Sequence, residues 1–341
     1  MAYTTIDKHT NFFDTKLFTG TNGSGQTISG LNFQPDFVWI KHRTDVSNHL
    51  VFDAVRTAGK DLRIHNSDSE ATQGDTLTAF TSDGFTLGTD SDVDSTGNVC
   101  SWNWKAGTTS GLSGGTITPT AYSINATSGF GIYKYTGNGT AGANIAHGLG
   151  KTPTMIWVKR LDSAKEWQIY HQAMGNGKWI EFTSAVRQQG TSRWNDTSPT
   201  STLFYLGNDS DVNGSGGSFI AYVWCDVPGY SKMGFFKGNQ VVDGAYFYTD
   251  FAPSFLLMKS TQSTEHWVMH DIKRSPYPNP SDEYLYPNLA NAEASGHTIN
   301  FLSNGIKVRT DNDQWNDDKE FMFMAFGQTV VGSNNVPCTA R

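Results

Sequence analysis

The sequence is short of charged residues and has no long apolar run. Charged residues are 17% of its 341 residues, and 25 Lys+Arg against 32 Asp+Glu give a net charge of −7. A mildly acidic chain without a basic block is poorly suited to wrapping nucleic acid or lying on an anionic membrane. No stretch approaches the roughly 20 apolar residues that span a bilayer. We therefore expect neither nucleic-acid binding nor membrane insertion.

Cysteines and export signals are also scarce. The three cysteines, Cys100, Cys225 and Cys338, are odd in number and far apart, which argues against a disulfide framework and a paired zinc site. The N-terminal MAYTTIDKHT lacks the basic start and apolar run of a secretory signal. We expect a protein assembled in a cytoplasm that, if it works outside the cell, leaves by a route other than signal-directed export.

Aromatic residues and glycine are plentiful. The chain contains 10 Trp, 13 Tyr, 21 Phe and 35 Gly. Aromatic and β-branched runs separated by Gly, Asn and Asp turns are typical of short strands. The composition predicts an all-β protein and argues against a helical bundle.

One set of landmarks occurs three times in the same order. In each copy a proline precedes an apolar run that ends in a lysine, as in Pro35–Lys41, Pro153–Lys159 and Pro253–Lys259. An aromatic residue and a glycine turn lie upstream of each proline, and an aromatic strand closes each copy. The repeat length of about 100 residues exceeds that of solenoid units and suits a β-sandwich. We predict three tandem, jelly-roll-like β-sandwich repeats.

The repeats set the predicted domain boundaries. We place the repeats at 18–114, 129–231 and 232–341, with residues 1–17 as an N-terminal anchor segment. The Gly/Ser/Thr-rich stretch 115–128 is predicted to be a linker that makes the first joint flexible. The second and third repeats abut closely.

An Asp-x-Asp pattern near the end of each repeat gives candidate metal ligands. Oxygen ligands at alternate positions resemble the first half of a calcium loop. The bidentate Glu expected at the twelfth position is absent, because Ser101 and Ile220 stand there. The alternative is that Asp and Asn cap turns and keep strand edges soluble. Calcium is the one cofactor left open, and its candidate ligands are Asp90, Asp92, Asp94, Asp209, Asp211, Asn213, Asp311 and Asp313.

Two tryptophans lie in loop-like sequence beside carboxylates and amides. A flat indole next to planar polar side chains can hold a sugar ring. The alternative is that each indole plugs the space under a long loop or forms a subunit contact. The candidate residues for binding a glycan or another partner are Trp194, Asn195, Asp196, Trp315, Asn316 and Asp317.

The sequence shows no catalytic constellation. His270-Asp271 has no Gly-x-Ser-x-Gly elbow to complete a triad, and the nucleotide-binding signatures are missing. His266 and His270 share one face of a predicted strand but lie too far apart for a metal pair. No carboxylate pair stands in a recognisable glycosidase motif. We expect a protein that is not an enzyme, with polysaccharide degradation as the least favoured alternative.

Several long blocks of the sequence resemble one family. They include MAYTTID (1–7), FQPDFVWIKHR (33–43), GFTLGTDSDV (84–93), HGLGKTPTMIWVKR (147–160) and YPNLANAEAS (286–295). These blocks are similar to a repeat domain of structural, tail-fibre-like proteins from marine tailed bacteriophages, cyanophages included. The resemblance implies a virion component and no established catalytic residue.

The resemblance and the residues together define the expected function. We expect a non-enzymatic virion structural protein, assembled in the host cytoplasm and serving as a tail appendage that contacts the host surface. A capsid decoration protein is the alternative within this class, and a glycan-binding module, with or without calcium, is the alternative from another class. The expected partners are other virion proteins, further copies of the chain with a trimer favoured, and a host-surface glycan.

Overall fold

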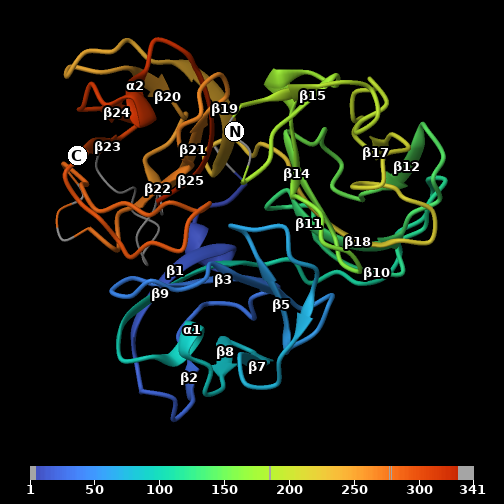
Figure 1. Ribbon diagram of the computed structural model, residues 1–341, viewed down its shortest axis with the longest axis horizontal. Helices are drawn as coiled ribbons and strands as arrows, with labels where there is room; N and C mark the ends of the chain where they lie inside the picture. The colour runs from blue at the N-terminus through green and yellow to red at the C-terminus, as the bar shows by residue number, and fades with distance from the viewer. Residues whose placement is uncertain (1–4, 184–185, 276, 278, 329–341) are drawn as a thin grey trace.

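The computed structural model describes residues 5–183, 186–275, 277 and 279–328. The chain is all-β, as predicted, and three parts surround a common centre (Figure 1). Within the described residues, no helix has the length and apolar character needed to cross a membrane. Helical structure there is limited to single turns: η1 (His9–Asn11), α1 (Ser91–Asp94), η2 (Gln172–Met174) and α2 (Asp313–Asn316).

The first part (residues 9–107) has a large and a small antiparallel sheet, in the orders β1-β9-β3-β4-β5-β6 and β2-β8-β7. The strands of the large sheet are β1 (Phe13–Gly20), β3 (Phe37–His42), β4 (Leu50–Asp53), β5 (Lys60–Arg63), β6 (Ala71–Thr72) and β9 (Gly97–Trp104). Those of the small sheet are β2 (Gln26–Ile28), β7 (Leu77–Thr81) and β8 (Gly84–Leu87).

The second part (residues 108–230) has a large sheet of order β10-β11-β18-β13-β14 and two strand pairs, β12-β17 and β15-β16. The large sheet contains β10 (Ala121–Asn125), β11 (Phe130–Thr136), β13 (Met155–Arg160), β14 (Gln168–His171) and β18 (Ser218–Trp224). The pairs contain β12 (Ala143–Ala146), β15 (Lys178–Trp179), β16 (Gln188–Gln189) and β17 (Leu203–Leu206).

The third part (residues 231–328) has sheets of order β19-β25-β21-β22 and β20-β24-β23. The strands of the first are β19 (Ser231–Lys237), β21 (Pro253–Ser260), β22 (Val268–Asp271) and β25 (Glu320–Gly327). Those of the second are β20 (Tyr246–Tyr248), β23 (Ile299–Leu302) and β24 (Gly305–Val308). The three large sheets share one order at their centre: β1-β9-β3-β4 in the first part, β11-β18-β13-β14 in the second and β19-β25-β21-β22 in the third. In each, the last strand of the part lies beside the strand of the apolar run marked by the repeated proline.

The apolar runs after the prolines are buried on both faces of their sheets. In β3, Phe37 and Trp39 belong to a central core, whereas Val38 and Ile40 belong to an outer core of the first part. Strands β13 and β21 divide their side chains between the central core and their own outer cores in the same way. Burial on two sides explains why these strands read as continuous apolar runs and do not alternate with polar residues.

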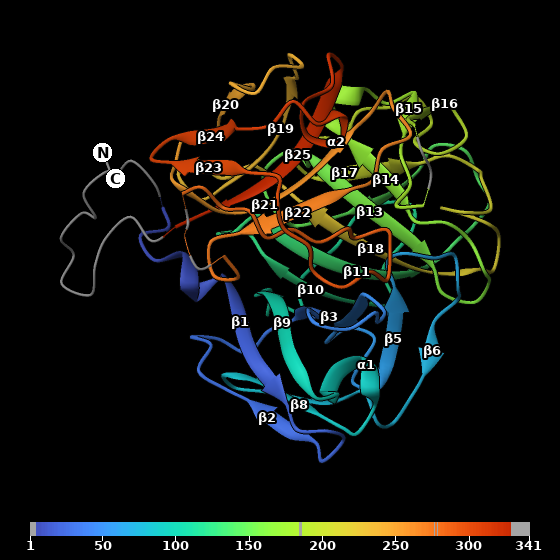
Figure 2. The ribbon, with the colours of Figure 1, turned by 60° about the vertical axis from the view of Figure 1, so that its left-hand side comes forward.

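The central core is shared by all three parts. Trp104 of β9 packs against Trp224 of the second part, with ring centroids 6.5 Å apart, and against Phe255 and Phe326 of the third, at 6.0 and 5.6 Å. Side chains from every large sheet join this one cluster. The three parts are therefore packed into one body, which Figure 2 shows from a second direction.

Two predicted connecting segments are part of this body. Residues 121–125, inside the predicted linker 115–128, form β10, and Ser123 Oγ donates to Asp36 Oδ1 across the joint at 3.0 Å. The prediction of a flexible first joint is therefore wrong. The segment Ala-Tyr-Ser-Ile-Asn forms a strand although the residues around it are rich in Gly, Ser and Thr. The predicted anchor 1–17 needs the same correction: β1 begins at Phe13, whose ring stacks on Phe326 at 4.8 Å. Residues 1–4 of that segment lie outside the described residues.

Candidate functional site

The Asp-x-Asp loops precede the last strand of each part; they are the single helical turns α1 and α2 in the first and third parts and a hydrogen-bonded turn at residues 209–213 in the second. Asp90 caps α1, because its side chain accepts a hydrogen bond from Asp92 N at 2.8 Å. Asn312 caps α2 and accepts from Gln314 N at 3.0 Å. These contacts are the turn capping that the sequence left as the alternative to calcium.

The third copy of the loop is offset by one residue from the expected alignment. Asn312, and not Asp311, occupies the cap position that Asp90 has in the first part. Asp311 and Asp313 are exposed, so the two predicted ligands of this copy point into solvent. The third part has one extra residue before the cap, and the spacing of its two aspartates did not reveal it.

The last residue of each turn fastens a distant loop. Asp94, Asn213 and Asn316 are fully buried, with exposed fractions of 0%. Each accepts a hydrogen bond from a backbone amide of the loop that follows β1, β11 or β19. The bonds run from Thr21 N to Asp94 (2.9 Å), from Asn138 N to Asn213 (2.9 Å) and from Asn239 N to Asn316 (3.0 Å). Burial alone would raise the pKa of Asp94, but hydrogen bonds from Thr21, Gln26 and Gly25 outweigh it and lower the pKa.

Replacing Asp94 by Ala is expected to lower the free energy of unfolding by about 2–3 kcal/mol, because buried donors lose their acceptor. The lost bonds come from Thr21 N and Oγ1, Gly25 N and Gln26 Nε2. Asp94→Asn introduces the residue that the other two parts carry here, so it is the matched control and should cost less. Urea denaturation measures both values, and equal losses would contradict this assignment.

Protein cations neutralise the candidate ligands of the second part. Arg193 pairs with Asp209 and, at 3.1 Å, with Asp211, and Lys165 lies 3.0 Å from Asp211. Arg193 therefore brings the predicted tryptophan loop and the predicted metal loop together, but as an ion-pair cluster. Among the residues that the structure describes, no group of three or more His, Cys, Asp or Glu is placed to hold a metal ion.

Calcium is accordingly expected to leave the stability unchanged. A ligand that binds only the folded state must raise Tm. We expect millimolar calcium chloride, compared with EDTA and with magnesium chloride, to shift Tm by less than about 1 °C in differential scanning fluorimetry. A calcium-specific rise in Tm would restore the Asp loops as a metal site.

The two candidate tryptophans lie in outer cores. Trp194 is 2% exposed and packs against Tyr170, with ring centroids 5.7 Å apart. Trp315 is 0% exposed, and its Nε1 donates to His270 Nε2 at 2.9 Å. The prediction that these indoles stack on sugars is wrong, because neither ring face reaches solvent. Each plugs an outer core under a loop, which was the alternative.

The polar neighbours of these tryptophans do not form one site. Asn195 and Asp196 have positive φ values of 53° and 47°, a left-handed turn that folds the chain back beside Trp194. Asn316 is buried, and its side chain is hydrogen-bonded to the loop that contains Asn239. Asp317 pairs with Lys319 at 2.6 Å. The two loops belong to different outer cores, in the second and third parts.

Two buried ion pairs at the joints between parts escaped the sequence analysis. Arg56 Nε lies 2.5 Å from Asp53 Oδ2, and none of either side chain is exposed. Asp53 also accepts from the hydroxyl of Tyr222 in the second part, at 2.6 Å. Asp271 and Arg274 of the third part repeat this pair at 2.5 Å. The signal was present: Asp-x-x-Arg occurs twice at the end of the strand that follows the proline strand.

Each joint uses the same position of the repeat. Trp102 of the first part donates through Nε1 to Asp271 Oδ2 of the third, at 3.0 Å. In the second part, His171 stands at this position, and its ring packs against Phe235 of the third part with centroids 4.9 Å apart. His171 Nδ1 accepts from Ala173 N at 3.1 Å, and burial lowers the pKa of His171 to about 3. This position of the joint is therefore uncharged, whereas Arg187 of the second part pairs with Glu320 of the third at 2.6 Å elsewhere along it.

His171 is expected to make the protein sensitive to acid. Its pKa is about 3 when folded, against 6.5 for the ordinary imidazole. The unfolded chain takes up a proton below pH 6.5 that the folded chain refuses, so stability is lost as the pH falls from 6.5 towards 3. His171→Asn keeps an acceptor but does not titrate. It should reduce the stability loss between pH 7 and pH 5 by about 2 kcal/mol, measured by urea denaturation; an unchanged loss would contradict this.

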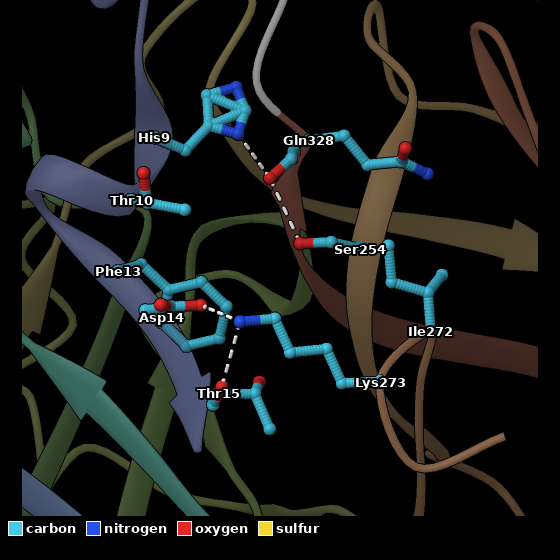
Figure 3. A pocket seen from close by; sticks show the side chains of 10 residues that line it. His9, Thr10, Phe13, Asp14, Thr15, Ser254, Ile272, Lys273 and Gln328 are labelled. Atoms are coloured by element: carbon cyan, nitrogen blue, oxygen red, sulfur yellow. Dashed lines mark hydrogen bonds and ion pairs between the residues drawn. The ribbon is translucent and has the colours of Figure 1, made fainter. Parts of the chain in front are cut away.

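A cavity of about 250 Å³ lies between the first and third parts (Figure 3). Lys273 Nζ donates there to Asp14 Oδ1 at 2.5 Å and to the Thr15 carbonyl at 2.9 Å. On its other side, His9 Nδ1 contacts the carbonyl of Gly327. The polar groups of this cavity bind one another across the seam between the two parts and do not converge on one point.

The fold and these contacts define an all-β, sandwich-like protein whose buried polar side chains fasten loops and join its parts. The chain belongs to the family described as "Domain of unknown function (DUF7483)", whose model matches residues 8–329. The match runs from the segment before β1 to the end of β25 and so includes all three parts. No curated protein matches the sequence.

Proposed function

We propose that this chain is a non-enzymatic structural protein of a bacteriophage virion, carried on a tail appendage and exposed to the host surface. The observation that favours this function is the central core, which makes one threefold body from a single chain. Phage appendages favour threefold symmetry, and a body of this kind suits a rotationally symmetric support. The phage context comes from the sequence blocks that resemble marine phage proteins.

The orientation of the most suggestive polar pair supports a structural function. His270 and Asp271 are adjacent on β22, so their side chains lie on opposite faces of the sheet. His270 meets Trp315 in an outer core, and Asp271 meets Trp102 and Arg274 at a joint. The two groups therefore act separately, each within a structural contact.

We further propose that each part is a copy of one jelly-roll-like sandwich repeat. The shared strand order of the large sheets supports this origin. So do the equivalent turn residues Asp94, Asn213 and Asn316, which bind the same loop of their parts. The homotrimer favoured from the sequence stays a prediction, and light scattering separates it from a 37.4 kDa monomer.

Immunogold electron microscopy of intact phage particles tests the proposed location. An antibody against this chain should label the tail, and antibody preadsorbed with the purified protein is the control. Label spread over the head would support a capsid decoration protein instead. Purified infectious particles that carry no label, and no copy of the chain by mass spectrometry, would refute a virion function.

A further inference from the structure

One buried carboxylate of the first part has no partner. Asp61 lies on β5 and is 2% exposed, and within the described part of the chain its Oδ1 accepts no hydrogen bond. No lysine, arginine or histidine of the described residues lies within ion-pair distance of its carboxylate. Burial raises the pKa of Asp61, and the charge of Arg63 offsets this only in part. A buried carboxylate without a partner costs folding free energy, so Asp61 calls for a reason outside folding.

The other two parts carry an aromatic ring where the first part carries Asp61. The strand registers align three cross-strand pairs: Val51 with Leu62, Ile169 with Ile180 and Met269 with Leu285. The residues that precede the second members of these pairs are therefore equivalent, and they are Asp61, Trp179 and Tyr284. Trp179 and Tyr284 are each 6% exposed and belong to outer cores. A large apolar side chain thus serves the fold at this position, and the smaller Asp61 leaves room for a ligand.

Asp61 borders a pocket of about 290 Å³ at the joint between the first and second parts. The pocket is lined from both sides of this joint, and Asp68 at its rim is exposed, so that it opens to solvent. Its lining residues include Asp61, Arg63, Asp68, Glu70 and Ala71 from the first part and Ala164 from the second. These six residues are named the Asp61 pocket below.

The other carboxylates around the pocket are already paired. The ion pairs are Asp68 with Arg63 at 3.2 Å, Glu70 with Arg56 at 3.2 Å and with Lys60 at 3.9 Å, and Asp53 with Arg56 at 2.5 Å. Four carboxylates therefore face three cations, and the negative charge left over is that of Asp61. In the second part a protein cation already lies at the equivalent position, because the guanidinium of Arg193 is 4.8 Å from the ring centroid of Trp179.

We propose that the Asp61 pocket binds a primary ammonium group, carried by a small amine or by a lysine side chain. Such a group brings one positive charge and three N–H donors to a carboxylate that lacks both. Its alkyl chain would lie beside the small apolar side chains of Ala71 and Ala164. A metal ion suits the pocket less well, because no group of three His, Cys, Asp or Glu among the described residues is placed to hold one. The site is independent of the proposed virion function.

Differential scanning fluorimetry of the purified full chain at neutral pH tests this site. The probes are n-butylammonium chloride for a free amine and Nα-acetyl-lysine amide for a lysine side chain, with potassium chloride at equal ionic strength and 1-butanol as controls. We expect one or both ammonium probes at about 20 mM to raise Tm by at least about 2 °C more than either control. Asp61→Asn should abolish this rise. Asp196→Asn removes the same charge from an exposed carboxylate of the second part and should respond like the unchanged protein.

The same variant separates a binding residue from a structural one without any amine. Asp61→Asn removes a buried charge that has no partner, so its Tm without amine should be higher than that of the unchanged protein. A lower Tm would show that the carboxylate serves the fold and would overturn the proposal. So would any of three results with the probes: no rise in Tm with either ammonium compound, an equal rise in Asp61→Asn, or an equal rise with potassium chloride.

Discussion

Replacing Arg56 by Met is expected to lower the free energy of unfolding by about 3–5 kcal/mol, because it removes one partner of a buried ion pair. The Asp53 carboxylate would keep its hydrogen bond from Tyr222 but lose the guanidinium at 2.5 Å. A carboxylate at 0% exposure has no water to replace that charge. Urea denaturation followed by circular dichroism measures the loss.

The second part supplies a matched control for this experiment. It carries His171 and Met174 where the first part carries Asp53 and Arg56, and both are buried. The double variant Asp53→His/Arg56→Met therefore replaces the ion pair by a neutral pair that the same fold already accommodates. It should be more stable than Arg56→Met alone. If the double variant is the less stable of the two, the buried charge is not the cause of the loss.

Replacing Trp104 by Ala is expected to cost about 3–5 kcal/mol and to weaken all three parts together, since a large cavity would open where they meet. Trp104 is 1% exposed, and its ring contacts include Trp224, Phe255 and Phe326 from the other parts. Hydrogen exchange should show lower protection in β3, β13 and β21 alike. Loss of protection in the first part alone would mean that the parts are independent.

A surface change in the same part is the control for Trp104→Ala. Leu17 lies on β1 and is 42% exposed. Its replacement by Ala is expected to change stability by no more than about 0.5 kcal/mol, because little apolar surface is withdrawn from the core.

The strands were predictable from the sequence, but their partners were not. The runs at Phe37, Met155 and Phe255 indicated buried strands because they are continuously apolar. Such a run indicates that both faces of the strand are buried, but it does not indicate which other residues bury them. The second cover is the central core, which is formed by residues more than 100 positions apart in the sequence, such as Trp104 and Phe326. Independent sandwiches were the simplest interpretation of a repeat, and the central core replaces it.

The candidate sites failed for a related reason. The spacing of Asp209 and Asp211 fits a calcium loop and a capped turn equally well. What separates the two is Arg193, which reaches both carboxylates from another loop. Trp194 has polar sequence neighbours typical of an exposed loop, but the left-handed turn that follows it folds the indole inward. Tertiary contacts of this kind leave no mark in residue spacing.

The seam between the first and third parts makes the architecture cyclic, although the polypeptide is linear. Phe13 stacks on Phe326, and His9 contacts the carbonyl of Gly327, so the two ends of the matched family domain are neighbours. Each part consequently touches both of the others, and no part is terminal in space. Circular permutants that begin at β10 or at β19, with residues 328 and 8 joined, would preserve every sheet. The order of the three parts along the chain is therefore set only by the position of the two termini in this ring of parts.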